Sequence, residues 1–178
     1  MTSRHLPLIG YRLWLADSAD LTLCSLTFDE VWPIGASVHS PIRPSEPAIY
    51  GGHGYHAMTN FFHADPDTAR FADSYSLWHT ISRLKDKWQG IKGKHWVAGA
   101  VLAWGEVALH DLGVMRAEFM KPLALHYSLS VRDEGAPPLD LRFLADKYRL
   151  PLIDSPAALT AYASEWGQPV TSEMLGAA

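Results

Sequence analysis

Short apolar runs separated by polar turns dominate the first third of the chain. Residues 10–16 (GYRLWLA) and 21–28 (LTLCSLTF) are rich in β-prone side chains and are joined by the polar turn DSAD. Two such runs across a short turn predict a β-hairpin. Proline and glycine in VWPIG, residues 31–35, are typical of an edge strand that leaves its sheet, and the prolines of SPIRPSEP then exclude a central strand.

The spacing of apolar residues changes to a helical one in the middle of the chain. Asp65 followed by Pro66 is a favourable helix start, with an N-cap aspartate before a proline at the first helical position. The apolar residues that then recur along one helix face are Phe71, Trp78, Ile81, Leu84 and Trp88. This spacing predicts one central helix over residues 65–90.

The strongest β signal is the stretch HWVAGAVLAWGEVALHDLGVMRAEFMKPLALHYSLSV, residues 95–131. It predicts a long hairpin that turns at HDLG, with Gly113 in the left-handed position of a three-residue turn. After the proline-bearing RDEGAPPLD, the spacing predicts two short helices over residues 139–148 and 156–166, with the short strand LPLID between them.

These elements place strands in two blocks around a central helix, with helices at the end of the chain. Strictly alternating βαβ units are absent, which argues against a doubly wound fold. We predict one α+β domain over residues 1–178, because this length fits a single core. Its parts are a β-rich region 8–64, the helix 65–90, the hairpin 95–131 and a helical region 138–170. The sheet is expected to be largely antiparallel and strongly bent or barrel-like.

Composition narrows the classes of function. The formal net charge of −4 argues against nucleic-acid binding, which needs a basic patch or stripe. The single cysteine, Cys24, excludes an internal disulfide and fits a reducing compartment. No run of 18 apolar residues occurs, and the first residues lack the apolar core of a signal peptide. We therefore expect a cytoplasmic protein that does not span a membrane, in the host cytoplasm if the gene belongs to a phage.

The stretch YGGHGYHAMTNFFH, residues 50–63, looks most like a chemical site. A phosphate-binding loop would need its glycines directly before a helix, yet several residues separate Gly54 from the expected helix start. A zinc site needs three or four ligands, for which His39, His53 and His56 are candidates. Residues three apart in a strand point to opposite faces, so His53 and His56 can share a metal only across a bend. The plainer interpretation, with glycines for close backbone approach and no bound cofactor or metal, is our expectation.

The long hairpin offers a second candidate site. A turn at residues 111–113 places Glu106 opposite Glu118, and alternation then puts four ionisable residues on one face: Glu106, His110, Arg116 and Glu118. Two opposed carboxylates repel, which raises the pKa of one of them and suits it to acid–base work. The alternative is a solvated lattice of ion pairs. A turn that differs by one residue would disperse the cluster.

Other catalytic chemistry has little support in the sequence. Cys24 lies inside a predicted strand among apolar neighbours, as expected for a small buried residue. Neither the G-x-S-x-G motif of a nucleophile elbow nor the H-E-x-x-H motif of a zinc protease occurs.

Several segments together resemble a family of small actinobacterial proteins. Its members carry a G-[FY]-[RK]-x-W opening, a W-P-x-G segment, a C-G-I-Y-A segment and a late L-W-G-x-V-x-x-H-E-x-G-x-R-A-E block. The similar segments here are GYRLW at 10–14, WPIG at 32–35, GYHA at 54–57, WGEV at 104–107, HDLGVMRAE at 110–118 and LADKYRLP at 144–151. The resemblance implies an actinobacterial or actinophage setting inside the cell, and no particular reaction.

The chain departs from that family in its cysteines. The positions where the family tends to carry cysteine lack it here, and His39 and His53 stand at or near two of them. Imidazole is also a zinc ligand, so a thiolate site is either lost or partly replaced by histidines.

The sequence leaves three possible functions open. The first is a non-catalytic binding or interaction module that holds a small ligand or a protein partner, with Trp104, Tyr55 and Trp32 as ligand-binding residues. The second is a small hydrolase or transferase that uses the hairpin cluster or a histidine-bound metal. The third is an accessory or structural protein of a phage or mobile element. Low charge and seven tryptophans favour the first, and a homo-oligomer is left open.

Overall fold

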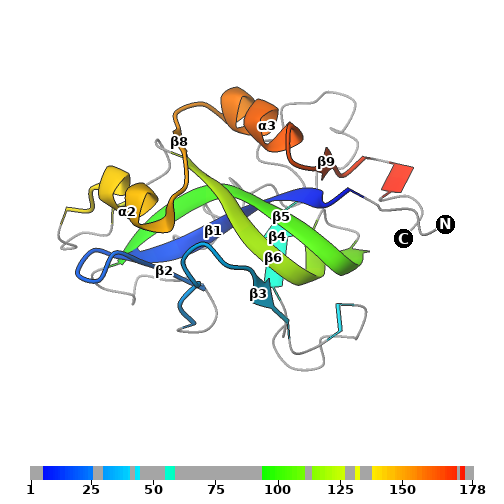
Figure 1. Ribbon diagram of the computed structural model, residues 1–178, viewed down its shortest axis with the longest axis horizontal. Coiled ribbons are helices and arrows are strands. Elements are labelled where there is room, and N and C mark those ends of the chain that lie inside the picture. The colour runs from blue at the N-terminus through cyan, green and yellow to red at the C-terminus, as the bar shows by residue number, and fades with distance from the viewer. Residues whose placement is uncertain are drawn as a thin grey trace.

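A computed structural model describes residues 6–25, 30–40, 43–44, 55–58, 94–110, 114–126, 131–132, 138–171 and 173–174. These residues form an α+β fold, in which a curled, largely antiparallel half-barrel sheet carries two short helices (Figure 1). The expected fold class is therefore confirmed. The central helix expected over residues 65–90 and the turn at 111–113 lie outside the described residues.

Three long strands form the main part of the sheet. They are β1 (Leu8–Asp17), β5 (Lys94–His110) and β6 (Val114–His126). β1 runs antiparallel to β5 along its whole length, and β5 and β6 form the long hairpin that the sequence predicts. Long strands twist, so the three strands coil around one another (Figure 1).

Six short strands extend this sheet. β2 (Thr22–Cys24) continues from β1 as the predicted first hairpin, and β7 (Val131–Arg132) pairs with β5. The others are β3 (Val38–His39), β4 (Tyr55–Met58) and β8 (Leu152–Ile153), which pair with β6, and β9 (Gln168–Pro169), which pairs with β1. The β8 and β9 pairings are parallel.

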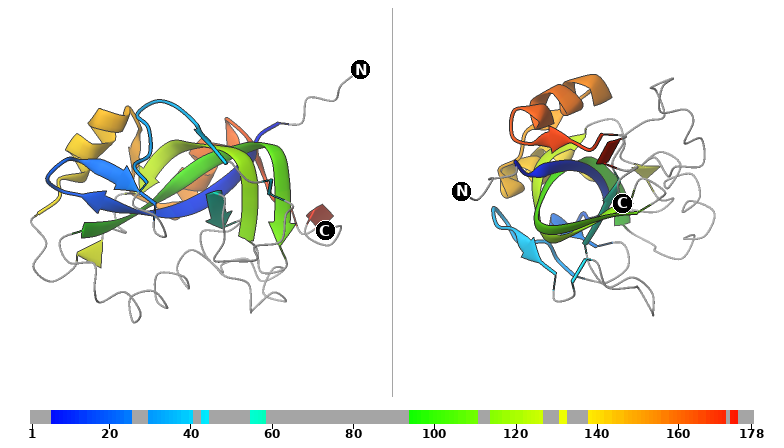
Figure 2. Two further views of the ribbon diagram at one scale, coloured as in Figure 1. Left: turned by 90° about the horizontal axis from the view of Figure 1, so that it is seen from below. Right: turned by 90° about the vertical axis from the view of Figure 1, so that its right-hand side faces the viewer.

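The sheet curls until its pairings return to the first strand. β4 pairs with β6 on one side and meets β1 at Tyr11 and Met58 on the other, so the order β1, β5, β6, β4 leads back to β1. The end-on view in Figure 2 shows this curl. Gly10 allows it, because a Cβ there would clash with the Met115 methyl group and lie 2.7 Å from the Cβ of Ala57.

Both faces of the sheet are covered. On β1, Ile9, Tyr11 and Leu13 pack in a cluster with Leu159 and Ala163 of α3 (Pro156–Ser164). Alternation turns the other side chains of β1 the opposite way. Trp14 and Ala16 there join the larger core, which includes Leu141, Leu144, Ala145 and Tyr148 of α2 (Leu141–Tyr148). No described helix is long and apolar enough to cross a membrane.

Local signals set the ends of the two helices. The Asp140 carboxylate accepts a hydrogen bond from the amide of Arg142 at 2.8 Å, and the Ser155 hydroxyl accepts one from the amide of Ala158 at 3.2 Å. Ser155 gives α3 its predicted start at Pro156, whereas the cap at Asp140 makes α2 begin at Leu141, two residues after the predicted start. α3 ends at Ser164, two residues before the predicted end, and Trp166 lies in the turn that follows.

Candidate functional site

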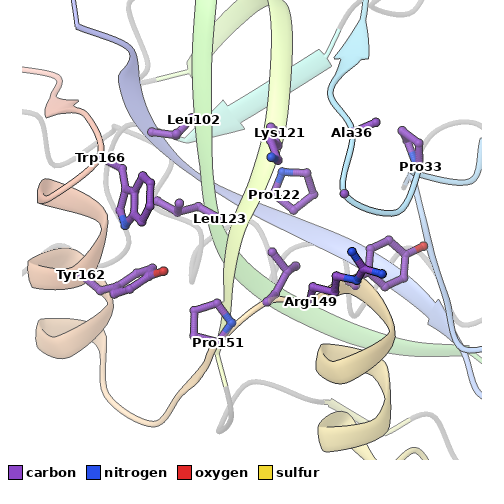
Figure 3. Close-up of a pocket in the computed structure, with 13 residues that line it drawn as sticks. Pro33, Ala36, Leu102, Lys121, Pro122, Leu123, Arg149, Pro151, Tyr162 and Trp166 are labelled. Atoms are coloured by element: carbon purple, nitrogen blue, oxygen red, sulfur yellow. The ribbon is translucent and has the colours of Figure 1, made fainter.

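A pocket of ≈ 360 Å³ lies beside β6, between the turn that follows Trp32 and the segments that carry α2 and α3 (Figure 3). Its position follows from strand pairing. On its outer edge β6 pairs with β3 up to Met120 and with β8 from Leu125 onward, and among the described strands none pairs with that edge in between. The pocket occupies this gap.

A break in the β5–β6 pairing forms the floor of the pocket. Ala100 pairs with Ala124 and Val101 pairs with Pro122, so Leu123 is an extra residue on β6. Pro122 has no amide hydrogen to donate to the sheet, which accounts for a bulge at this place. Bulges redirect side chains, and here Pro122 and Leu123 both line the pocket together with Leu102 of β5.

Two aromatic rings form one side of the pocket. Tyr162 of α3 and Trp166 of the following turn lie four residues apart, with ring centroids at 6.3 Å and planes inclined by 50°. Trp166 is 53% exposed, although most of the large apolar residues that the structure describes are buried. Figure 3 shows both rings on the side of the pocket away from Pro33 and Ala36.

Two cations lie across the pocket from these rings. Lys121 belongs to β6, and Arg149 directly follows α2 in the left-handed backbone region, with φ 56°. Both residues are exposed, and neither forms an ion pair with any residue that the structure describes. The described residues that line the pocket include no aspartate or glutamate.

A buried tyrosine holds the wall of the pocket in place. The Tyr148 hydroxyl donates to the carbonyl oxygen of Trp32 at 3.0 Å and accepts from the amide of Leu23 at 2.9 Å. Burial raises the pKa of this phenol, so it stays protonated. Through these bonds α2 is fixed to β2 and to the turn that begins at Pro33, and the cavity between them is pre-formed.

The structure changes the predicted geometry of the hairpin cluster. Trp104 pairs with Phe119 and Val107 pairs with Ala117, so Gly105 and Glu106 both lie opposite Glu118. With φ +79° at Gly105, this is a bulge with glycine in its first position. Glu106 thus lies opposite Glu118, as the turn predicts, but within a bulge that interrupts the regular alternation of the two strands.

The four cluster residues have different surroundings. Glu106 is exposed, and its backbone amide donates to Oε2 of Glu118 at 3.1 Å. Arg116 is 3% exposed and lies opposite Ala108, in the register that the turn predicts. His110 ends β5 opposite Val114, and its side chain lies outside the described residues. The acid–base chemistry expected of these residues stays a prediction.

Three rings stack across neighbouring strands near this bulge. Phe119 lies between Trp104, at 5.8 Å and 13°, and His39, at 4.7 Å and 24°. Both neighbours are its direct pairing partners on β5 and β3. Nε2 of His39 also lies 3.7 Å from Oε1 of Glu118. The metal candidate His39 and the ligand candidate Trp104 are thus joined by Phe119, a residue that sequence reasoning did not single out.

The remaining candidates are buried or outside the described side chains. Trp32 has no exposed surface, and contact of its ring with a ligand would require the core to open. Tyr55 and His56 belong to β4, but their side chains lie outside the described residues, as does His53 entirely. Within the described part of the chain, no three histidine, cysteine, aspartate or glutamate residues are grouped as metal ligands.

A buried histidine at the end of β6 gives the protein a pH-dependent stability. His126 is 1% exposed; burial lowers its pKa below the ordinary 6.5, and Asp154 partly opposes this shift. The unfolded chain then takes up a proton at higher pH than the folded protein. The free energy of unfolding should therefore decrease as the pH falls below 6.5, until the lowered pKa of the folded state is reached.

Urea unfolding measured between about pH 7 and about pH 5 checks this expectation. In His126→Gln the residue cannot take up a proton, so its midpoint should fall less steeply with pH than that of the unchanged protein. Comparing how steeply the two midpoints change with pH cancels any loss of stability that the substitution causes at every pH. Parallel curves for the two proteins would contradict the argument.

Comparisons with models of protein families, with curated proteins and with solved structures found no match to this chain. The resemblance to the actinobacterial family stays a prediction. The pocket was not anticipated from the sequence. The available signals were the four-residue spacing of Tyr162 and Trp166, and a proline at position 122 inside an otherwise regular strand pattern.

Proposed function

We propose that this protein is a non-catalytic binding module, and that the pocket beside β6 holds a small ligand with a flat apolar part. The observation that carries the proposal is the combination of a ≈ 360 Å³ cavity, an apolar floor and the two rings of Tyr162 and Trp166. Ligand pockets are typically apolar clefts of about 300–1,000 Å³ with a few polar groups. This cavity is at the small end, so it suits a molecule of one or two fused rings.

The walls of the pocket support binding because strand pairing and hydrogen bonds hold them in place. Leu102 and Leu123 stand on the two longest strands, and Tyr148 joins the opposite wall to the core through two hydrogen bonds. A pre-formed cavity spares the ligand the cost of ordering its site. Tyr162 and Trp166 then offer large ring surfaces, which contribute strongly to binding when a flat ligand covers them.

The groups that line the pocket favour binding over catalysis. Its described lining holds no serine, cysteine, histidine, aspartate or glutamate. Those side chains supply most nucleophiles and general bases in enzymes. Of the ionisable groups present, the Tyr148 phenol is engaged in the fold and its pKa is raised by burial.

Trp166→Ala is expected to weaken binding of naphthylacetamide, a neutral flat probe, by about tenfold, because the probe loses a stacking surface. Titration followed by ligand-observed NMR measures the affinity. Phe143→Ala is the matched control, since Phe143 is an aromatic residue that is 63% exposed on α2 and does not line the pocket. Equal loss of affinity in both variants, or no binding to the unchanged protein, would refute the proposed function.

A further inference from the structure

The two sides of the pocket differ in charge as well as in shape. The whole chain carries a formal charge of −4, yet the described lining has two cations and no anion. Figure 3 shows Tyr162 and Trp166 beside Leu123 on one side of the pocket; Lys121 and Arg149 lie further from these rings, and in this view Pro122 lies between the two cations. An apolar surface thus leads from the rings to a positively charged end.

The backbone at Arg149 adds a second observation. With φ 56° and ψ 43°, this residue is in the left-handed region at the end of α2, where glycine or asparagine is favoured. Its amide donates to the carbonyl oxygen of Asp146 at 3.1 Å, a bond that the amide of glycine could also make. The arginine side chain is therefore not needed to end the helix. Strained backbone conformations are common at functional sites, so the strain at Arg149 is consistent with a role of this residue in binding.

Lys121 lies at the start of the stretch of β6 between its pairings with β3 and β8. It lies on β6 directly after Met120, the last residue that pairs with β3, and opposite Leu102, which lines the pocket. Its neighbour Pro122 begins the bulge of the floor. Lys121 thus lines the cavity from a strand that pairs with β3 before this gap and with β8 after it.

We infer that the ligand is an amphipathic anion, with a flat apolar part against Tyr162 and Trp166 and a carboxylate or similar singly charged head at Lys121 and Arg149. This inference rests on the proposed binding function and names the ligand class. Lysine and arginine form charge-assisted hydrogen bonds to a carboxylate, and Arg149 can do so with two parallel N–H groups. Because both cations are exposed, the contribution of the charge is moderate and falls with ionic strength.

A pair of probes tests the charge independently of the pocket. Naphthylacetate and naphthylacetamide share the ring system and differ in the charged head. At low ionic strength the unchanged protein should bind naphthylacetate about five- to tenfold more tightly, a preference that salt reduces. Equal affinities would overturn the inference and leave the proposed function intact. Failure of both probes to bind would overturn both.

Variants assign the preference to the two cations. Lys121→Gln with Arg149→Gln should remove the preference for naphthylacetate, measured as the ratio of its affinity to that of naphthylacetamide in the same variant. Arg142→Gln is the control, because Arg142 is an exposed cation of α2 that does not line the pocket. A preference that persists in the double variant, or that is lost in the control, would contradict the assignment.

Arg149→Gly separates binding from folding. Glycine relieves the left-handed conformation, so this variant should melt at a higher temperature and yet lose part of the preference for naphthylacetate. An arginine with only a structural role would instead lower the melting temperature and leave the preference unchanged. A peptide that ends in phenylalanine with a free carboxylate is a further probe. If it binds more tightly than naphthylacetate, the small-ligand inference is replaced by recognition of a chain terminus.

Discussion

Replacing Trp32 with alanine is expected to lower the free energy of unfolding by about 3–5 kcal/mol. The Trp32 ring has no exposed surface and meets the Trp14 ring edge-on, with centroids 5.5 Å apart and planes at 86°. On its face lies the Arg12 guanidinium, 4.8 Å from the ring centroid. The substitution would leave a large cavity and remove the aromatic face that stabilises a buried cation.

Urea unfolding of Trp32→Ala and Trp166→Ala measures this effect with the same chemical change at two sites. Trp166 is 53% exposed, so its removal should change the unfolding midpoint far less. Trp32→Phe should recover part of the lost stability, since it keeps a ring beneath Arg12. Similar midpoints for the two alanine variants would show that Trp32 is not the structural residue that its burial indicates.

Periodicity predicted the parts of this fold that depend on local signals. The hairpin of β5 and β6 has the predicted register next to its turn, where Ala108 lies opposite Arg116. The helix starts follow from capping residues that can be recognised in the sequence, Asp140 and Ser155. These features depend on neighbours along the chain or directly across a short turn.

The bulges could not be predicted in the same way. Alternation alone assigns Glu106 to a regular pair, whereas the left-handed conformation at Gly105 inserts an extra residue and places the amide of Glu106 against the carboxylate of Glu118. Pro122 has the same effect further along β6. A glycine or a proline in a strand pattern indicates that a bulge is tolerated, but the position of the neighbouring strands decides whether it forms.

The pocket is the feature that sequence reasoning missed, and the reason is physical. It exists because, among the strands that the structure describes, none pairs with β6 between β3 and β8, and because α2 and α3 flank that gap. No local pattern encodes this arrangement. Trp32, a ligand-binding candidate from the sequence, is buried by contacts with Trp14 and Arg12, which are distant in sequence.

Gly105→Val is expected to destabilise the protein by about 2–4 kcal/mol, through backbone strain and overpacking together. At φ +79° the backbone of a β-branched residue is strained, even where the side chain has enough space. There is little space here, because a Cβ would lie 2.5 Å from Oε2 of Glu118 and 2.9 Å from Cδ2 of Phe119. The carboxylate would have to move, and the amide of Glu106 would lose its acceptor.

Thermal unfolding and near-ultraviolet circular dichroism test the two parts of this argument. The melting temperature should fall well below that of Glu106→Val, the control in the adjacent exposed position of the same bulge. The aromatic dichroism should also change, because displacing Phe119 disturbs its stacking with Trp104 at 5.8 Å. Gly105→Ala should show a smaller loss, since alanine has the Cβ without the branched methyl groups. An unchanged melting temperature in Gly105→Val would reject the bulge as a requirement of the fold.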